Sequence, residues 1–227
     1  MPELRGGAAR SGPRALVVDW GGVLTEPIEG ALRTWAELDG VDFTTYVEVM
    51  RDWLGDHHGA LARDNPVAAL ERGEIEVPHF EEQLAARLTV AGGRPPSGGG
   101  RGLLQRMFDQ FEHAPAMSAL VLRARRAGLL TGLLSNSWGN DYPREGWDLM
   151  FDAVVISGEV GMRKPEAEIF AHVLDLLGVP AHETVFVDDL TVNIEAARGL
   201  GMVAVHHRSY HQTAAELEQL FGVPLRS

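Results

Sequence analysis

Short, continuous runs of apolar, β-favouring residues recur along the chain and constrain its fold more than any other feature. The first run, Ala15 to Val18, leads into Asp19, and similar runs follow at 129–134, 153–156, 184–187 and 202–205. A continuous apolar run predicts a strand buried on both faces, as in a parallel sheet. Amphipathic segments at 115–127, 165–177 and 193–200 lie between these runs, each followed by a glycine. This alternation predicts an α/β fold, a three-layer α/β/α Rossmann-like core with a mostly parallel sheet.

Polar residues follow three of the predicted strands. Asp19 follows the first, Ser135 follows the run at 129–134, and Asp188-Asp189 follow the run at 184–187. In open α/β sheets, ligands bind beyond the carboxyl ends of the strands. We therefore expect these side chains to converge on one site.

The stretch 25–113 differs from the rest because it contains no convincing strand. Helices are predicted at 30–38, 43–54, 66–72 and 78–88, followed by a Gly/Pro-rich loop at 91–102. Such an insertion directly after the first strand predicts a small helical cap domain over the site. We expect a core domain of 14–24 and 114–227 and a cap domain of 25–113.

Charge and composition exclude several classes of function. The formal charge is −12 over 227 residues, so binding to nucleic acid or to an anionic membrane is not expected. Without cysteine, disulfides, thiolate metal sites and a cysteine nucleophile are excluded. No signal peptide or long apolar run is recognisable, which favours a cytoplasmic protein. An acidic core with a helical cap can be a monomer or a homodimer.

Four segments carry a resemblance to a known family. VVDWGGVLT, LLSNS, GMRKPE and VFVDDLTVNIEAARGLGM occur in the order and spacing of the four motifs of the haloacid dehalogenase-like (HAD) hydrolase superfamily. The chain most resembles the helical-cap subfamily, in particular its sugar phosphatases and the N-terminal domain of epoxide hydrolases. The resemblance implies a magnesium-dependent phosphohydrolase that acts on a small phosphorylated metabolite.

The same resemblance implies a nucleophile and a metal site. Asp19 would form an aspartyl-phosphate, and Mg²⁺ would be bound by Asp19, by the backbone carbonyl of Gly21 and by Asp189. Asp188 would assist the metal or pair with Lys164, and the two aspartates could exchange roles. A carboxylate attacks phosphorus only when the charge on both partners is neutralised, which Mg²⁺ accomplishes while aligning them.

Further residues are expected to position the phosphate. Lys164 supplies the local positive charge that an acidic protein needs, whereas its neighbour Arg163 is interpreted as a surface residue. Ser135 and Asn136 can hydrogen-bond phosphate oxygens, or they can simply form the turn after the strand. Trp20, next to the nucleophile, is a candidate for the pocket floor or for packing.

One departure from the family pattern keeps alternatives open. Phosphatases of this family usually carry an aspartate two positions after the nucleophile as general acid and base, but here the residue is Gly21. The leaving group could be a good one, the acid could come from the cap (Glu26, His57 and His58 are weak candidates), or catalysis could be slow. A 2-haloacid dehalogenase acting through an aspartyl ester and a weakly catalytic binding protein are the alternative functions. Asp188-Asp189 favour the phosphatase, since a dehalogenase needs no divalent metal.

Overall fold

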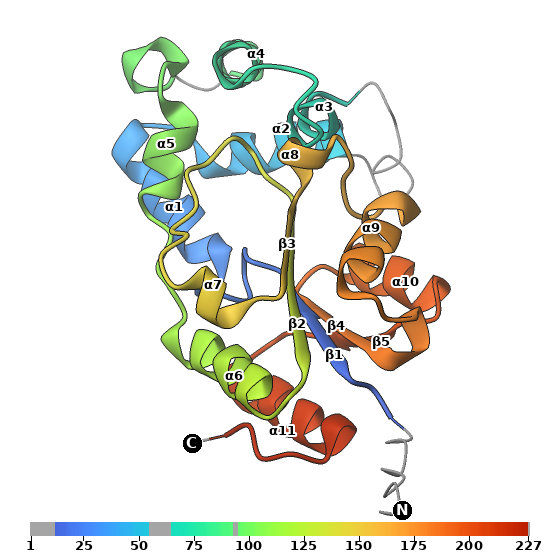
Figure 1. The fold of residues 1–227 in the computed structure, drawn as a ribbon. Helices are drawn as coiled ribbons and strands as arrows, with labels where there is room; N and C mark the ends of the chain where they lie inside the picture. The colour runs from blue at the N-terminus through green and yellow to red at the C-terminus, as the bar shows by residue number, and fades with distance from the viewer. Residues whose placement is uncertain (1–11, 55–64, 93–94, 227) are drawn as a thin grey trace, which may run out of the picture.

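A five-stranded parallel sheet lies at the centre of the computed structural model, which describes residues 12–54, 65–92 and 95–226 (Figure 1). The strands are arranged in the order β3-β2-β1-β4-β5, and every neighbouring pair is parallel. Their bounds are β1 (Ala15–Val18), β2 (Leu130–Ser135), β3 (Ala153–Ile156), β4 (Thr184–Asp188) and β5 (Val203–His206). The predicted strands are therefore all present, with bounds shifted by at most one residue.

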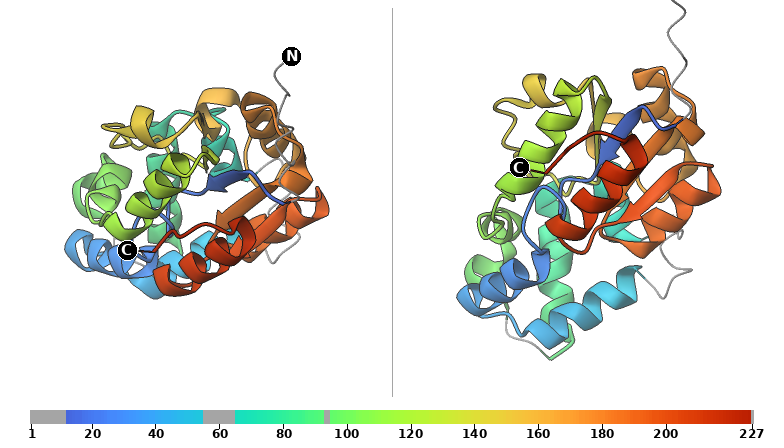
Figure 2. Two further views of the ribbon diagram at one scale, coloured as in Figure 1. Left: turned by 60° about the horizontal axis from the view of Figure 1, so that its bottom comes forward. Right: turned by 90° about the horizontal axis from the view of Figure 1, so that it is seen from below.

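Helices cover both faces of the sheet, which confirms the three-layer α/β/α architecture. Leu16 and Val18 of β1 pack with α6 (Pro115–Arg126), α7 (Trp147–Met150) and α11 (Tyr210–Phe221). Ala15 and Val17 pack on the opposite face with α9 (Ala167–Leu177) and α10 (Thr191–Gly199). Because successive residues of a strand point to opposite faces, a strand apolar at every position is what two helical layers require. Figure 2 shows the two layers from other directions.

Between β1 and α6 lies a helical segment with a hydrophobic cluster of its own. Its bounds are α1 (Ile28–Asp39), α2 (Phe43–Leu54), α3 (Pro66–Glu71), α4 (Val77–Val90), the 3₁₀ turn η2 (Ser97–Gly100) and α5 (Leu103–Phe108). The cluster centres on Trp35, Phe80 and Leu84, all fully buried. An antiparallel bridge between Thr25 and His113 joins the two connections to the core. This bridge lies at the predicted domain boundary, although a separate cap domain stays a prediction.

Within the described residues, four α-helices were not predicted, namely α5, α7, α8 (Ser157–Val160) and α11, and one predicted helix begins later than expected. α5 follows directly after the glycine-rich stretch, and α11 begins at Tyr210 after Ser209, whose hydroxyl accepts from the N–H of Gln212. The helix predicted from residue 165 begins at Ala167. A Ser N-cap and a left-handed Gly222 flank α11, which are readable start and stop signals.

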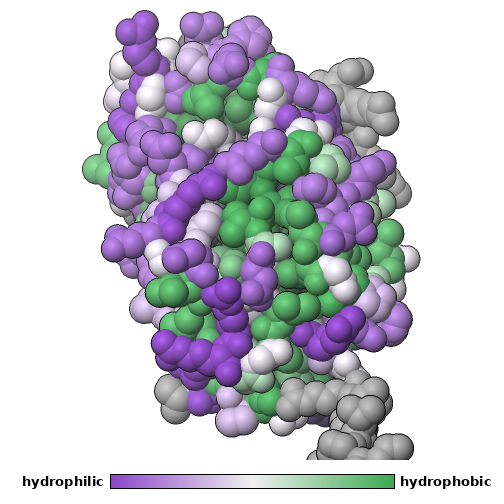
Figure 3. Space-filling view, viewed as in Figure 1, coloured by the Kyte–Doolittle hydropathy of each residue, from purple (hydrophilic) through white to green (hydrophobic). Residues whose placement is uncertain are grey.

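Hydrophobic residues reach the surface on the face drawn in Figure 3. They gather in the middle of this view, where the edge strand β3 lies in Figure 1, with hydrophilic residues around them. None of the helices in the described ranges is long and apolar enough to cross a bilayer.

Candidate active site

Three aspartates meet at the carboxyl ends of two adjacent strands. The register places Val18 of β1 beside Val187 of β4, so Asp19 emerges next to Asp188 and Asp189. The N–H of Asp19 donates to the carbonyl of Val187 at 2.9 Å, which fixes this alignment. One carboxylate oxygen from each aspartate lies within 4.8 Å of the others. The expected convergence of these acidic side chains is thus a property of the parallel register.

Lys164 lies between two of these carboxylates. Its Nζ is 2.8 Å from Oδ1 of Asp19 and 2.7 Å from Oδ2 of Asp188, and the residue is 1% exposed. Burial works to lower the pKa of Lys164, but the ion pairs with Asp188 and Asp19 raise it above its ordinary value. Lys164 is also the only lysine among the 20 basic residues of the chain. Its compact ammonium contacts both carboxylates at once.

The cluster holds more negative charge than one lysine neutralises. Burial raises the pKa of Asp19 to about 8, against the lowering effect of Lys164 and together with repulsion from Asp188 and Asp189. Burial and repulsion from Asp188 likewise raise the pKa of Asp189 to about 6. Both carboxyls therefore favour a cation or a proton nearby. An all-oxygen set of this charge suits a hard divalent cation such as Mg²⁺.

Gly22 makes room for one of the aspartates. It adopts φ +69°, and a Cβ at this position would collide with the carboxylate of Asp189. Only glycine accommodates both the left-handed backbone and this close approach. By contrast, a Cβ at Gly21 would meet nothing within 4 Å. The turn after the nucleophile therefore depends on the second glycine, and the first leaves open space beside Asp19.

Asn193 also holds the carboxylate of Asp188. Its Nδ2 donates to both oxygens of Asp188, at 3.1 and 3.0 Å, and the N–H of Leu190 donates to Oδ1 at 2.8 Å. Asp188 is fully buried, and both of its carboxylate oxygens accept hydrogen bonds from these donors and from Lys164. Asp189 is partly exposed and faces the cavity described below. The pair thus divides into one enclosed carboxylate and one that a ligand can reach.

Ser135 and Trp20 are tied together by a residue that the sequence did not single out. The hydroxyl of Tyr142 lies 3.0 Å from Oγ of Ser135, and its ring packs edge-on against Trp20 at 5.0 Å between centroids. Burial raises the pKa of Tyr142 to about 12, so the phenol stays protonated. Tyr142 is partly buried and lies in the irregular loop after β2, where no periodic pattern indicates its contacts.

The interpretation of Arg163 as a surface residue is wrong. Arg163 is 4% exposed and pairs with Glu71 of α3, from the helical segment. Glu71 also accepts from Nε1 of Trp138 at 2.9 Å and from Nδ2 of Asn136 at 3.2 Å. A guanidinium is buried only when paired, and here the partner lies 92 residues away in the chain.

The side chain of Asn136 is directed at the protein itself. Its Oδ1 accepts from the N–H of Lys164 at 2.8 Å, and its Nδ2 donates to the carbonyl of Lys164 at 3.0 Å. This amide therefore positions the backbone of the lysine. A direct role for Asn136 in substrate binding stays a prediction.

A cavity of about 560 Å³ opens over Asp19. The helical segment contributes one wall of the cavity. The floor opposite this wall is formed by residues of the core, namely Asp19, Trp20, Gly21, Ser135, Lys164 and Asp189. Volumes of this size are typical of small-molecule sites. Of the weak candidates for a general acid, Glu26 is exposed and absent from the described lining, and His57 and His58 lie outside the described residues.

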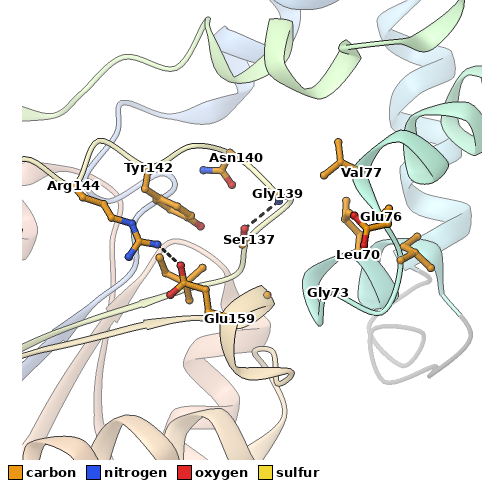
Figure 4. Close-up of a pocket in the computed structure, with 13 residues that line it drawn as sticks. Leu70, Gly73, Glu76, Val77, Ser137, Gly139, Asn140, Tyr142, Arg144 and Glu159 are labelled. Carbon is orange, nitrogen blue, oxygen red and sulfur yellow. Dashed lines mark hydrogen bonds and ion pairs between the residues drawn. The ribbon is translucent and has the colours of Figure 1, made fainter.

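A second, smaller cavity of about 300 Å³ lies between the loop after β2 and the connection from α3 to α4 (Figure 4). Arg144 on its rim pairs with Glu159, and Oγ of Ser137 accepts from the N–H of Gly139 at 3.0 Å. Its charged pair is satisfied, and the three aspartates lie outside its lining. The larger cavity is therefore the candidate active site.

Known proteins resemble the chain in sequence and in fold. The family model of haloacid dehalogenase-like hydrolases matches residues 13–201. Bifunctional epoxide hydrolase 2 of Sus scrofa is 29% identical to this chain over 93% of the chain's length. The match covers only 39% of the length of that enzyme. The sesquiterpene phosphatase astK of Aspergillus oryzae is 30% identical over 72% of the chain and 83% of its own length.

A solved structure shares the fold at lower identity. The HAD family enzyme bt-2542 of Bacteroides thetaiotaomicron, in complex with magnesium and inorganic phosphate, superposes with a TM-score of 0.62. The alignment covers 87% of this chain and 95% of that one at 21% identity. This similarity supports the arrangement of sheet and helices described above.

Proposed function

The chain belongs to the haloacid dehalogenase-like hydrolases, and from that premise we propose that it is a Mg²⁺-dependent phosphohydrolase acting on a small phosphorylated metabolite. The observation that carries the proposal is the group of Asp19, Asp188 and Asp189 around Lys164. Its excess negative charge suits a divalent cation, and a cation beside a carboxylate nucleophile suits phosphoryl transfer. The Aspergillus oryzae relative, a sesquiterpene phosphatase, supports a phosphate ester as substrate.

In the proposed reaction Asp19 is the nucleophile. A carboxylate oxygen of Asp19 forms a bond to phosphorus while the ester bond breaks, and the leaving oxygen takes up a proton. Water then attacks the aspartyl-phosphate, which releases inorganic phosphate and restores the carboxylate. Asp19, Asp189 and the backbone carbonyl of Gly21 would hold Mg²⁺, with Asp188 in support through Lys164. When bound, the ion would neutralise charge on the nucleophile and the phosphate.

The remaining site residues would bind the phosphate and shape the floor. Lys164, already charged and fixed between two carboxylates, would stabilise the negative charge on the transferring group. Ser135 would donate its hydroxyl to a phosphate oxygen, with Tyr142 as its partner on the other side. Asn136 would act chiefly through Lys164, and Trp20 would form part of the floor.

We also propose that residues 14–24 and 114–227 form the core domain and residues 25–113 the cap domain. The separate hydrophobic cluster of the helical segment supports this division. So does the close pairing of the two connections, where Glu26 N–H donates to Glu112 and Ala114 N–H donates to Leu24, each at 2.8 Å.

Phosphate release from acetyl phosphate tests the proposal, since this substrate has a good leaving group and needs no acid from the protein. We expect turnover with Mg²⁺, none in EDTA, and a loss of at least about 10³-fold in Asp19→Asn. Asp175→Asn, an exposed aspartate on α9, is the matched control and should retain full activity. Activity that survives EDTA or Asp19→Asn would contradict the proposal.

Gly21, in place of the usual second aspartate, is compatible with a second candidate, a 2-haloacid dehalogenase acting through an aspartyl ester. Chloride release from 2-chloropropionate in EDTA would identify it, and absence of release together with phosphatase activity would exclude it. A protein that merely binds phosphorylated ligands would keep its ligand affinity in Asp19→Asn while showing no turnover in either form.

A further inference from the structure

The two walls of the 560 Å³ cavity differ sharply in chemistry. The floor carries the ionic groups of Asp19, Lys164 and Asp189. The wall that the helical segment contributes is mainly hydrocarbon and comes from α1, α2 and α5. Its apolar members include Ile28, Leu32, Val47, Met50, Leu54 and Phe108. With Mg²⁺ bound as proposed, a ligand that fills this cavity has an anionic end at the floor and an apolar end at the helical wall.

The polar side chains of the cavity offer little to a polar leaving group. Tyr46 of α2 lines the cavity, but the residue is only 4% exposed and its ring packs against Trp35 and Phe43. Among the described residues on the helical wall, Glu71 already accepts from Arg163, Trp138 and Asn136. Arg51 is exposed, so water solvates its guanidinium and the interior of the wall receives no cation from it. A sugar or nucleotide buries several hydroxyl or amide groups, and each one left without a partner weakens binding markedly.

One buried donor on the core side does face this region. Nδ2 of Asn140 is buried and has no hydrogen-bond partner among the described residues, and Asn140 lines the cavity. A single amide can serve one phosphate or ester oxygen. It cannot satisfy the ring of hydroxyl groups that a sugar carries.

We propose that the group esterified to phosphate is apolar and uncharged, so that the substrate is the phosphate monoester of a hydrocarbon alcohol. This inference rests on the proposed function and names its substrate class. A cavity of about 560 Å³ lies in the range of small-molecule sites and has room for a phosphate with a hydrocarbon group attached.

A series of n-alkylphosphonates, from ethyl to hexadecyl, tests the inference without requiring turnover. The P–C bond is not hydrolysed, so calorimetric titration of the full chain in Mg²⁺ reports binding alone. Each added methylene should strengthen binding about fourfold, equivalent to about 0.8 kcal/mol. The gain should stop once the chain fills the cavity, because a longer chain projects into water. A series that stays flat, or that rises without a limit, would overturn the inference.

Two variants connect the effect to the helical wall. Leu32→Asn should weaken decylphosphonate about tenfold or more, and weaken ethylphosphonate less, because only the longer chain reaches that wall. Val47→Thr, which preserves volume, should weaken the longer ligands in the same direction if Leu32→Asn folds poorly. Leu38→Asn is the matched control on the same helix, since Leu38 is 69% exposed and does not line the cavity. An equal loss in the control would overturn the assignment.

Turnover separates this inference from the proposed function. If acetyl phosphate is hydrolysed and decyl phosphate exceeds glucose 6-phosphate at least tenfold in kcat/KM, both stand. If acetyl phosphate is hydrolysed but glucose 6-phosphate is preferred, the apolar substrate class is wrong and the phosphohydrolase stands. If nothing is hydrolysed while the phosphonate series still rises to a limit, the hydrolytic function is wrong and the apolar ligand class is right.

Discussion

Replacing Lys164 with methionine tests whether the carboxylate cluster depends on this one cation. Methionine keeps an unbranched side chain but removes the charge, so Asp19 and Asp188 lose a partner at 2.8 and 2.7 Å. Removing one member of a buried ion pair costs about 3–5 kcal/mol, because a charge stays buried without compensation. Two carboxylates lose the same partner, and Lys164 is only 1% exposed. We therefore expect a loss of about 4–5 kcal/mol at pH 9.

The loss should be smaller at pH 5. The pKa of Asp19 is already raised to about 8 from 3.8, and it rises further once Lys164 no longer lowers it. A carboxyl with a raised folded-state pKa contributes stability below its unfolded pKa, and this stability is lost as the pH rises through the folded-state pKa. Near pH 5 the folded variant therefore keeps Asp19 protonated and neutral. At pH 9 the folded state has to bury the charge.

Urea unfolding in EDTA, followed by tryptophan fluorescence, measures both values. With a slope of about 3 kcal/mol/M, the midpoint should fall by about 1.5 M at pH 9. Arg87→Met is the matched control, since Arg87 pairs with Asp52 at 2.9 Å but the two side chains are 44% and 60% exposed. That change should cost less than about 1 kcal/mol. A loss for Lys164→Met below about 1 kcal/mol at pH 9, or equal losses at the two pH values, would refute the reasoning.

Three further predictions concern neighbouring residues. Gly21→Asp should fold, since a Cβ there meets nothing within 4 Å. This variant should release phosphate from an alkyl phosphate up to about 10²-fold faster. Gly21→Asn should show no such gain in rate, and an equal gain would contradict an acid role. Mg²⁺ binding at pH 7 should release protons, because the pKa values of Asp19 and Asp189 are raised to about 8 and 6. Calorimetry in buffers of different ionisation enthalpy measures this release, which should be smaller at pH 9. Equal proton release at the two pH values would contradict the raised pKa values. Glu71→Gln should lower the free energy of unfolding by about 2–3 kcal/mol, because the buried Arg163 loses its carboxylate partner. Glu74→Gln is the control, since the side chain of Glu74 is 52% exposed, and it should cost less than about 1 kcal/mol. Similar urea midpoints for the two variants would argue against a buried pair.

Much of the core was readable from sequence because its signals are local. β1 is apolar at all four positions, so both of its faces must be buried, as they are between two helical layers. Glycines after α9 and α11 adopt left-handed φ values of 64° and 66°, as a helix stop requires. The expected meeting of Asp19 with Asp188-Asp189 followed from one rule, that parallel strands present their carboxyl ends at the same edge.

The errors and omissions concern contacts between distant segments. Arg163 reads as a surface residue because arginine usually is one, and only α3 brings Glu71 to it. Tyr142 lies in an irregular loop, so nothing in its surroundings along the chain indicates a hydrogen bond to Ser135. The amide of Asn136 holds the backbone of Lys164, a contact that the sequence did not indicate, while its role in substrate binding stays a prediction.

By itself, the sequence determined the three-layer fold, the edge of the sheet where the site lies and the kinds of residue that meet there. These depend on strand periodicity, strand order along the chain and charge, which are properties of short segments. Only the tertiary structure decided that Lys164 is enclosed by Asp19 and Asp188, and that the wall facing them is hydrocarbon. The physical reason is that burial and partnership are set by residues from far along the chain, and these determine both the charge state and the ligand that fits.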